Sequence, residues 1–227
     1  MSGQATRCEP VIAPGSPVLF DMDGTLVLSE HVHRRVWDRF FADWRMDVDE
    51  ATYARTYLGR RAGDVLAQVD GPWRGTDVRS ALAGLAAHSH ELAGEVEAVG
   101  GARDLVRELH RRGHRIAVVT SAGREWARRV LGDVLGLADA LELVVTAEDV
   151  SVGKPSPEGY LTACRRLAVD PACCAAVEDS PSGVQALAAA GVGTIIGVTT
   201  SSPAAELRHA GAGLTVPDLR PEALLHG

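Results

Sequence analysis

Lysine, cysteine and long apolar runs are scarce in this chain of 227 residues. Its four cysteines, Cys8, Cys164, Cys173 and Cys174, lack the spacing of a metal site, and the adjacent pair suits neither a zinc site nor an ordinary disulfide. We therefore expect reduced thiols. No apolar stretch is long enough to span a bilayer, and residues 1–17 lack the long apolar segment of a signal peptide. These features predict a cytoplasmic protein with no membrane partner.

An excess of basic side chains is also missing, because the formal net charge is −7. Non-specific binding to nucleic acid is therefore not expected. An anionic small molecule remains a possible substrate, since the local charge of a cleft outweighs the total. Lys154 is the only lysine, and every other permanent side-chain cation is an arginine. We infer that Lys154 has a task that arginine does not perform.

Strand and helix patterns alternate through the second half of the chain. Apolar runs rich in β-branched residues predict strands, and amphipathic stretches between them predict helices. The predicted strands are 18–21, 115–119, 141–145, 174–177 and 194–198, and the helices are 101–112, 124–131, 157–167 and 181–190. This alternation predicts an α/β fold, with a parallel sheet flanked by helices.

The stretch from Ser29 to Glu97 breaks this rhythm with helical patterns alone. It is far longer than one crossover helix requires. We interpret it as an all-helical domain inserted after the first strand, with hinges near Leu28 and Val99 that place a lid above the strand ends. The predicted organisation is a flexible tail at 1–16, a core of residues 17–28 and 99–227, and a helical cap at 29–98.

Polar side chains follow four of the predicted strands, at the point where each strand ends. They are Asp21 and Asp23, Thr120 and Ser121, Lys154, and Glu178 and Asp179. Because ligands bind at the carboxyl ends of the strands in open α/β sheets, we expect these side chains to share one crevice. A strand that simply ends in an Asp-Gly turn is the alternative, but it accounts for Asp23 and not for an acid at Asp21, inside the apolar pattern.

The chemistry of this group favours phosphoryl transfer. Carboxylates without His or Cys ligands form a hard oxygen site that suits Mg²⁺. Asp21 can attack phosphorus and form an acyl phosphate, while the metal and Lys154 offset the repulsion between the anions. Asp23 can protonate the leaving oxygen and later activate water, which requires its pKa to lie above that of Asp21. The Thr120 hydroxyl and nearby backbone N–H groups can hold phosphate oxygens, and Gly24 permits a tight turn.

These residues resemble the four motifs of the haloacid dehalogenase superfamily. The matching segments are Asp21-Met22-Asp23-Gly24-Thr25, Val118-Val119-Thr120-Ser121, Gly153-Lys154-Pro155 and Glu178-Asp179-Ser180-Pro181-Ser182-Gly183. The resemblance covers residues 18–219 and implies a Rossmann-like core with a helical cap inserted after the first motif. It implies Asp21 as nucleophile and Asp23 as acid and base. It also implies magnesium ligands from Asp21, Asp179 and the backbone carbonyl of Asp23, with Glu178 acting directly or through water. Phosphate contacts are implied for Gly24, Thr25, Thr120, Ser121, Ala122 and Lys154.

Within the superfamily, residues 153–161 look most like those of small sugar-phosphate and polyol-phosphate phosphatases. This likeness implies a small phosphorylated sugar or polyol as substrate, and we expect a monomer or weak dimer. Two positions depart from the pattern. Leu28 stands where relatives usually carry an acid, and Gly100-Gly101 stands where they carry a Pro-Gly pair.

Other activities of the superfamily leave different signatures. Dehalogenases lack an acid at the position of Asp23, and phosphonate-cleaving members need a cap lysine, which residues 29–97 do not contain. A sugar phosphomutase of the β-phosphoglucomutase type remains an alternative, because His33 matches a cap histidine of that enzyme, although its cap lysine has no counterpart here. A regulator that binds a phosphorylated ligand without turnover is a third reading, disfavoured because such a role would not need Asp23.

Three cap residues are candidates for substrate contacts. His33 lies one helical turn into the cap, where a plain surface histidine is the alternative. Arg60 and Arg61 lie in the polar turn 58–63 between two predicted cap helices. An arginine there can bind a sugar hydroxyl or phosphate, and a solvated turn is the alternative.

Overall fold

The central sheet is parallel and six-stranded. The computed structural model describes residues 10–57, 60, 62–75 and 77–225. In these residues the strand order is β5-β4-β1-β6-β7-β8. The strands are β1 (Val18–Phe20), β4 (Ile116–Val119), β5 (Leu143–Val145), β6 (Ala175–Glu178), β7 (Thr194–Val198) and β8 (Leu214–Val216). The last, β8, was not predicted from the sequence.

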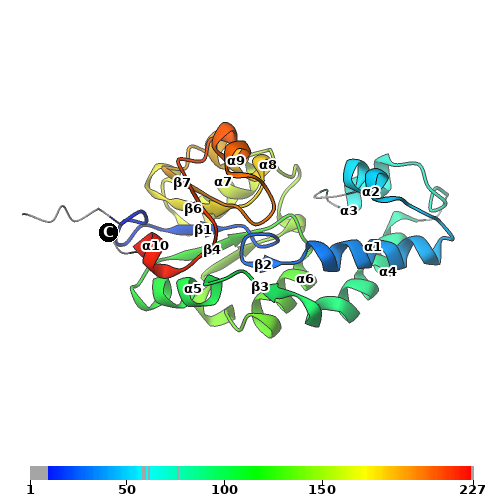
Figure 1. The fold of residues 1–227 in the computed structure, drawn as a ribbon, viewed down its shortest axis with the longest axis horizontal. Helices are drawn as coiled ribbons and strands as arrows, with labels where there is room; N and C mark the ends of the chain where they lie inside the picture. Colours follow the sequence, from blue (N-terminus) through cyan, green and yellow to red (C-terminus); the bar gives the residue numbers. More distant parts are fainter. Residues whose placement is uncertain (1–9, 58–59, 61, 76, 226–227) are drawn as a thin grey trace, which may run out of the picture.

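Helices cover both faces of this sheet (Figure 1). On one face lie α5 (Ala102–Arg111), α6 (Arg124–Arg128), the π-helix η2 (Arg129–Val134) and α10 (Pro221–Leu225). On the other lie α7 (Glu158–Leu167), α8 (Pro181–Ala190) and α9 (Ala204–Ala210). Alternate residues of β1 serve the two layers, because Phe20 packs in the cluster below the sheet and Leu19 in the cluster above it. Short 3-10 turns complete the loops: η3 (Ala138–Ala140), η4 (Ala147–Asp149) and η5 (Pro171–Cys173).

The inserted helices form a separate group beside the strand ends, named the cap segment below (Figure 1). They are α1 (Glu30–Asp43), α2 (Glu50–Thr56), α3 (Ala62–Gln68), α4 (Val78–Leu92) and η1 (Ala93–Glu95). Their two linkers pair as the short antiparallel strands β2 (Val27–Leu28) and β3 (Glu97–Ala98). The predicted α/β fold class with an inserted helical cap is confirmed, and the exact domain limits stay a prediction.

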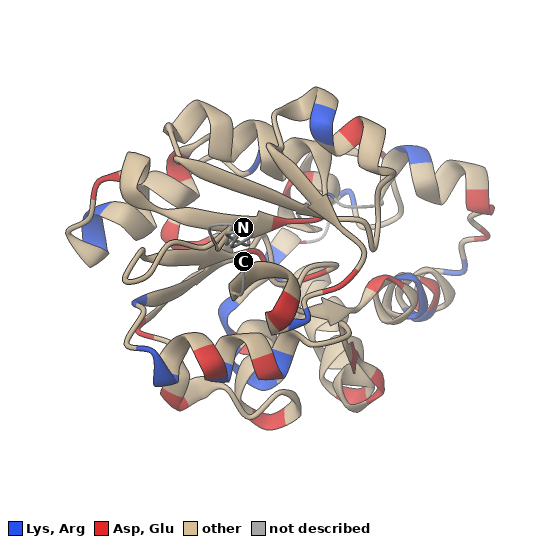
Figure 2. Ribbon diagram, turned by 60° about the vertical axis from the view of Figure 1, so that its left-hand side comes forward, with Lys and Arg blue, Asp and Glu red and all other residues tan. Residues whose placement is uncertain are grey.

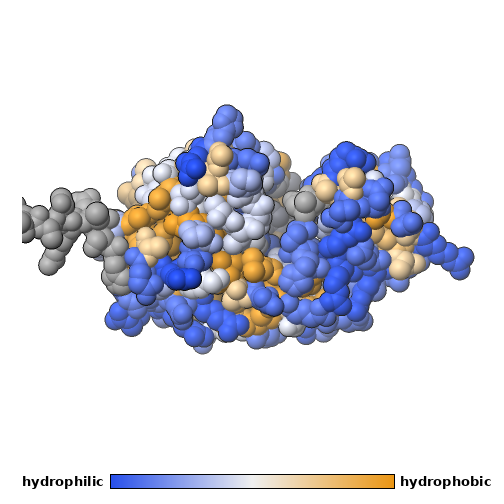
Figure 3. Space-filling model, viewed as in Figure 1, coloured by the Kyte–Doolittle hydropathy of each residue, from blue (hydrophilic) through white to orange (hydrophobic). Residues whose placement is uncertain are grey.

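Aromatic packing holds the cap segment together. The rings of Trp37, Phe41 and Tyr57 lie 4.9–5.5 Å apart, between centroids, and Trp73 joins them through Phe40. Burial of such rings contributes most of the stability of a small helical unit. The opposite side of α1 is polar, and the surface over this helix is mainly hydrophilic in the view of Figure 3. Charged residues lie mainly on helices and loops, whereas the sheet strands carry few (Figure 2).

The tail at residues 1–16 stays a prediction, although one of its residues packs on the core. Within residues 10–16, Ile12 is buried and its N–H donates to the Leu224 carbonyl at 3.1 Å, whereas residues 13–15 are exposed. The physical reason for the burial of Ile12 is α10, a five-residue helix that supplies an apolar surface and that the sequence did not predict. Residues 1–9 lie outside the described residues. No helix in the described ranges is long and apolar enough to cross a membrane.

Strand register brings the motif residues together. Phe20 is level with Val118 on one side and with Val177 on the other. The residues that follow these three positions therefore lie at one height, at the carboxyl edge of the sheet. Asp21 follows Phe20 directly, and Glu178 follows Val177.

Candidate active site

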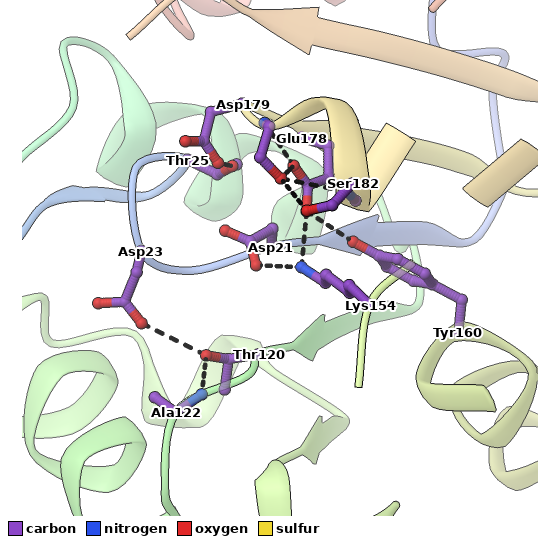
Figure 4. A network of polar contacts seen from close by, with 12 residues as sticks. Asp21, Asp23, Thr25, Thr120, Ala122, Lys154, Tyr160, Glu178, Asp179 and Ser182 are labelled. Atoms are coloured by element: carbon purple, nitrogen blue, oxygen red, sulfur yellow. Dashed lines mark hydrogen bonds and ion pairs between the residues drawn. The ribbon is translucent and has the colours of Figure 1, made fainter. Parts of the chain in front are cut away.

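Four motif side chains converge at the carboxyl edge of the sheet (Figure 4). Asp21 follows β1, Glu178 ends β6, and Asp179 follows it. Lys154 reaches in from the loop after β5 and η4, and it is bound to both Asp21 and Glu178. The crevice predicted from the sequence is therefore present in the fold.

The two carboxylate oxygens of Asp21 differ in their hydrogen bonding. Its side chain is buried, and Oδ1 accepts a hydrogen bond from Lys154 Nζ. The other oxygen, Oδ2, is also buried and has no hydrogen-bond partner among the described residues. Burial raises the pKa of Asp21 well above its usual value, and Glu178 and Asp179 add to this, although Lys154 opposes it. A buried carboxylate oxygen without a partner is costly, which indicates a missing positive partner.

Glu178 is held on both oxygens. Oε1 accepts from Lys154 Nζ at 2.6 Å and from the Tyr160 hydroxyl at 3.4 Å. Oε2 accepts from the backbone N–H of Ser180 at 2.7 Å and from its hydroxyl at 2.9 Å. Gly183 leaves the space for this carboxylate, because a Cβ there would lie 1.6 Å from Oε1. Glu178 therefore forms its charged contact with Lys154. The negative charge of Glu178 helps to keep the Lys154 ammonium group close to Asp21.

Asp179 is oriented by residues of the first motif. The Thr25 hydroxyl donates to Oδ1 at 2.9 Å, and Ser201 forms a further side-chain hydrogen bond. Gly24 has φ +89°, and a Cβ there would lie 2.0 Å from Asp179 Oδ2. Burial beside Glu178 raises the pKa of Asp179 to about 6. Thr25 was predicted to contact phosphate, but it is fully buried and binds Asp179 instead.

The three acids can hold a metal ion. One ligand oxygen from each of Asp21, Glu178 and Asp179 lies within 4.8 Å of the others. The set contains oxygen donors alone, which suits a hard cation such as Mg²⁺. The unpartnered Oδ2 of Asp21 is the observation that fits such an ion, since a cation there would satisfy this buried atom. Glu178 fits an indirect role better, because its oxygens already have partners.

Asp23 lies to one side of this group and has its own set of donors. Oδ1 accepts from the Ser29 hydroxyl at 2.7 Å and lies 3.1 Å from Trp126 Nε1 and 3.2 Å from His33 Nε2. Oδ2 faces the Thr120 hydroxyl at 3.4 Å. Burial would raise the pKa of Asp23, but the charge of His33 and these hydrogen bonds outweigh it and lower the pKa.

Without a bound metal ion, the pKa values of the two acids shift in opposite directions. The pKa of Asp21 is raised and that of Asp23 is lowered, the reverse of what the sequence suggested. The cause is His33, whose position beside Asp23 could not be read from the chain. Burial lowers the pKa of His33, and the Asp23 carboxylate raises it to a greater extent. The contact thus favours the carboxylate form of Asp23 and the protonated form of His33.

The loop after β4 contributes polar groups beside Lys154. The Thr120 hydroxyl accepts from the backbone N–H of Ala122 at 2.9 Å, so this N–H, predicted to hold phosphate, is used within the loop. Ser121 is exposed. Thr120 and Ser121 line a small pocket together with Lys154 and Tyr160.

The three cap residues predicted to contact substrate differ in where they lie. His33 reaches the site through Asp23, with about a third of its side chain exposed. Arg60 is bound within the cap segment, where its guanidinium donates to Gln68 Oε1 at 2.6 Å and to the Thr56 carbonyl at 3.1 Å. Arg61 lies outside the described residues.

Sequence reasoning missed four residues that hold the acids: Ser29, Trp126, Tyr160 and Ser201. Ser29 precedes α1, a position typical of a helix cap, yet its hydroxyl donates to Asp23 and makes no capping bond. This departure is visible only in the structure. The other three carry no local pattern that separates them from packing or loop residues.

Comparisons with known proteins agree with this geometry. The family model of haloacid dehalogenase-like hydrolases matches residues 18–191. Validoxylamine A 7'-phosphate phosphatase of Streptomyces hygroscopicus subsp. limoneus is 37% identical over 85% of this chain and 89% of its own length. Hexitol phosphatase A of Escherichia coli (strain K12) is 36% identical over 76% of this chain and 78% of its own. Both similarities extend across the cap segment and the core.

A solved structure shares the whole arrangement. CbbY from Rhodobacter sphaeroides, crystallised in complex with phosphate, superposes with a TM-score of 0.80 and 26% identity. The match covers 92% of this chain and 97% of that chain.

Proposed function

The chain belongs to the haloacid dehalogenase-like hydrolase family, and we propose that it is a Mg²⁺-dependent phosphatase acting on a small sugar or polyol phosphate through a phosphoaspartate. Its relatives are named phosphatases, and it is a phosphoric monoester hydrolase. The observation that carries the proposal is Asp21. One of its oxygens is bound to Lys154, and the other is buried without a partner next to Asp179.

Asp21 is the nucleophile in this proposal. A bond forms between its carboxylate oxygen and phosphorus, and the ester P–O bond breaks with its electron pair moving to the leaving oxygen. Lys154 reduces the repulsion between Asp21 and the phosphate, and Glu178 keeps Lys154 in place. Thr120 and Ser121 supply hydroxyl groups beside the phosphate.

The leaving oxygen takes its proton from Asp23, which is thereby converted to its carboxylate form. Water then attacks the acyl phosphate, Asp23 accepts its proton, and inorganic phosphate is released. This second step needs Asp23 as a carboxylate, the form that the charge of His33 and the hydrogen bonds to Asp23 favour.

The metal site consists of Asp21, Asp179 and, by the family resemblance, the backbone carbonyl of Asp23. A bound Mg²⁺ would supply positive charge for the phosphoryl oxygens. Thr25 and Ser201 orient Asp179 for this role.

A small substrate agrees with the cap segment and with the relatives, which are named for a validoxylamine phosphate and for hexitols. A cytoplasmic location and a monomer or weak dimer remain part of the proposal.

The test is phosphate release from a panel of sugar and polyol phosphates with Mg²⁺. We expect Asp21→Asn to lower the rate by more than about 10³-fold. Asp47→Asn, at an exposed cap aspartate, is the matched control and should leave the rate unchanged. Persistent Mg²⁺-dependent release by Asp21→Asn would disprove the mechanism. Interconversion of sugar phosphates without phosphate release would indicate the phosphomutase, and ligand binding without turnover would indicate the regulator.

A further inference from the structure

Trp126 lies at the site without a role in the reaction described above. It belongs to α6, the helix that follows β4, and its ring packs against the main hydrophobic cluster. Its indole Nε1 lies 3.1 Å from Asp23 Oδ1, although 103 residues separate the two along the chain. A tryptophan N–H is a donor only, so Asp23 is the acceptor in this bond.

The hydrogen bond from Trp126 helps to determine which oxygen of Asp23 can contact substrate. Three donors meet at Oδ1, from Ser29, His33 and Trp126. Oδ2 has one long contact, with the Thr120 hydroxyl at 3.4 Å. The carboxylate is therefore anchored through Oδ1, and Oδ2 is turned towards the loop that lines the pocket beside Lys154. Oδ2 is then the oxygen that exchanges a proton with substrate.

The three donors come from different parts of the molecule. Ser29 precedes α1 and His33 lies within it, so both belong to the cap side. Trp126 belongs to the core side, on a helix attached to the sheet. Its ring also meets the His33 ring edge-on, with 5.4 Å between centroids and an interplanar angle of 85°. Trp126 thus touches both Asp23 and the cap residue that contacts the same oxygen of Asp23.

We propose that Trp126 is a positioning residue for Asp23: its N–H holds Oδ1 so that Oδ2 faces the leaving oxygen, and its ring docks His33 of the cap segment. This inference rests on the proposed phosphatase function. Trp126 acts through Asp23, and kcat/KM reports the first proton transfer that Asp23 makes. When the ester P–O bond breaks, the leaving oxygen takes the electron pair and receives a proton from Asp23.

The dependence of kcat/KM on the leaving group of the substrate tests this role of Trp126. A polyol alkoxide needs the proton, whereas p-nitrophenolate leaves without it. We would measure kcat/KM with Mg²⁺ for p-nitrophenyl phosphate and for sorbitol 6-phosphate or glycerol 3-phosphate, whichever the wild type cleaves faster. Trp126→Phe keeps an aromatic ring beside His33 and removes the N–H. We expect kcat/KM to fall about 10- to 100-fold for the polyol phosphate and less than about 3-fold for the aryl phosphate.

Two further variants make the result specific. Trp126→His restores a ring N–H. We expect it to recover at least about a third of the loss in log(kcat/KM) that Trp126→Phe causes for the polyol phosphate. It also keeps the test open where the Phe variant does not fold. Trp44→Phe is the matched control: this partly buried tryptophan packs against Phe40 and Trp73 in the cap segment, and both activities should stay unchanged.

Each outcome decides a separate question. Equal losses on both substrates, or no loss on either, would overturn the positioning role of Trp126. Failure of the His variant to recover activity would overturn the role of the N–H. A wild type that releases no phosphate from any substrate would instead refute the proposed function.

Discussion

Gly183 is the position where one methyl group tests the architecture of the site. It lies within α8, and a Cβ built there would be 1.6 Å from Glu178 Oε1. Ordinary contact of a Cβ begins near 3.4 Å, so the carboxylate would have to retreat by about 1.8 Å. That shift breaks its 2.6 Å bond to Lys154 and disturbs the bonds from Ser180.

The expected size follows from two opposing effects. Alanine in place of glycine inside a helix stabilises by about 1 kcal/mol. Loss of a hydrogen bond to a charged group costs about 1.5–3 kcal/mol, and Glu178 has more than one at risk. We therefore expect Gly183→Ala to lower the free energy of unfolding by about 2 kcal/mol. Displacement of Lys154 should lower kcat/KM for phosphate release by about 10²-fold.

Gly84→Ala provides the matched control. Gly84 also lies inside a helix, α4, and a Cβ there meets nothing within 4 Å. The free energy of unfolding of this variant should rise by about 0.5–1 kcal/mol, and its rate of phosphate release should not change. Urea denaturation and initial rates of phosphate release give both quantities. The reasoning is refuted if Gly183→Ala is stabilised like Gly84→Ala and remains as active.

Three other expectations concern the metal site and the cap segment. Thr25→Val removes the hydroxyl that orients Asp179 and should weaken Mg²⁺ binding about 10- to 100-fold, measured by titration calorimetry; unchanged affinity would disprove this role. Without Mg²⁺ the pKa of Asp179 is raised to about 6, above its unfolded value near 4, so the folded protein binds more protons in this window and stability rises as pH falls through it. Asp179 should therefore favour folding at pH 5 over pH 7 by about 1 kcal/mol, compared with Asp179→Asn by thermal denaturation, and an effect of the opposite sign would contradict the assigned burial. Arg60→Ala should change KM less than about 2-fold, because Arg60 is bound to Gln68 and Thr56, and a large rise in KM would show that it contacts substrate.

The parts of the fold that the sequence predicts well are those with a local periodic signal. The strand at residues 194–198 was placed at its observed limits, as was the helix from Pro181 to Ala190, whose cap Ser180 and final Gly191 are both local signals. The helix predicted at 124–131 covers only the first half of the π-helix η2, and the five-residue α10 was missed, because a segment so short or irregular carries little periodicity. Ile12 was assigned to a tail for the same reason, since its burial depends on α10.

For the candidate site too, the residues with a local sequence signal were predicted and their distant partners were not. Asp21, Lys154 and Glu178 were found because each follows a predicted strand, and the sheet brings strand ends together. Their partners depend on contacts between distant segments, such as Thr25 with Asp179, which are 154 residues apart. No local pattern reports such a pairing, so the sequence did not predict the contact between Thr25 and Asp179 or the effect of His33 on the pKa of Asp23.

Charge balance explains why these acids tolerate burial together. Asp21, Asp23, Glu178 and Asp179 contribute four negative charges when ionised. Within the described part of the chain, Lys154 and protonated His33 are the cations bound to them, which leaves two negative charges unmatched. The raised pKa values of Asp21 and Asp179 are the response of the protein to this excess. A divalent cation at the unpartnered Oδ2 of Asp21 would balance both charges, whereas a monovalent ion would balance one, so we expect the site to prefer a dication.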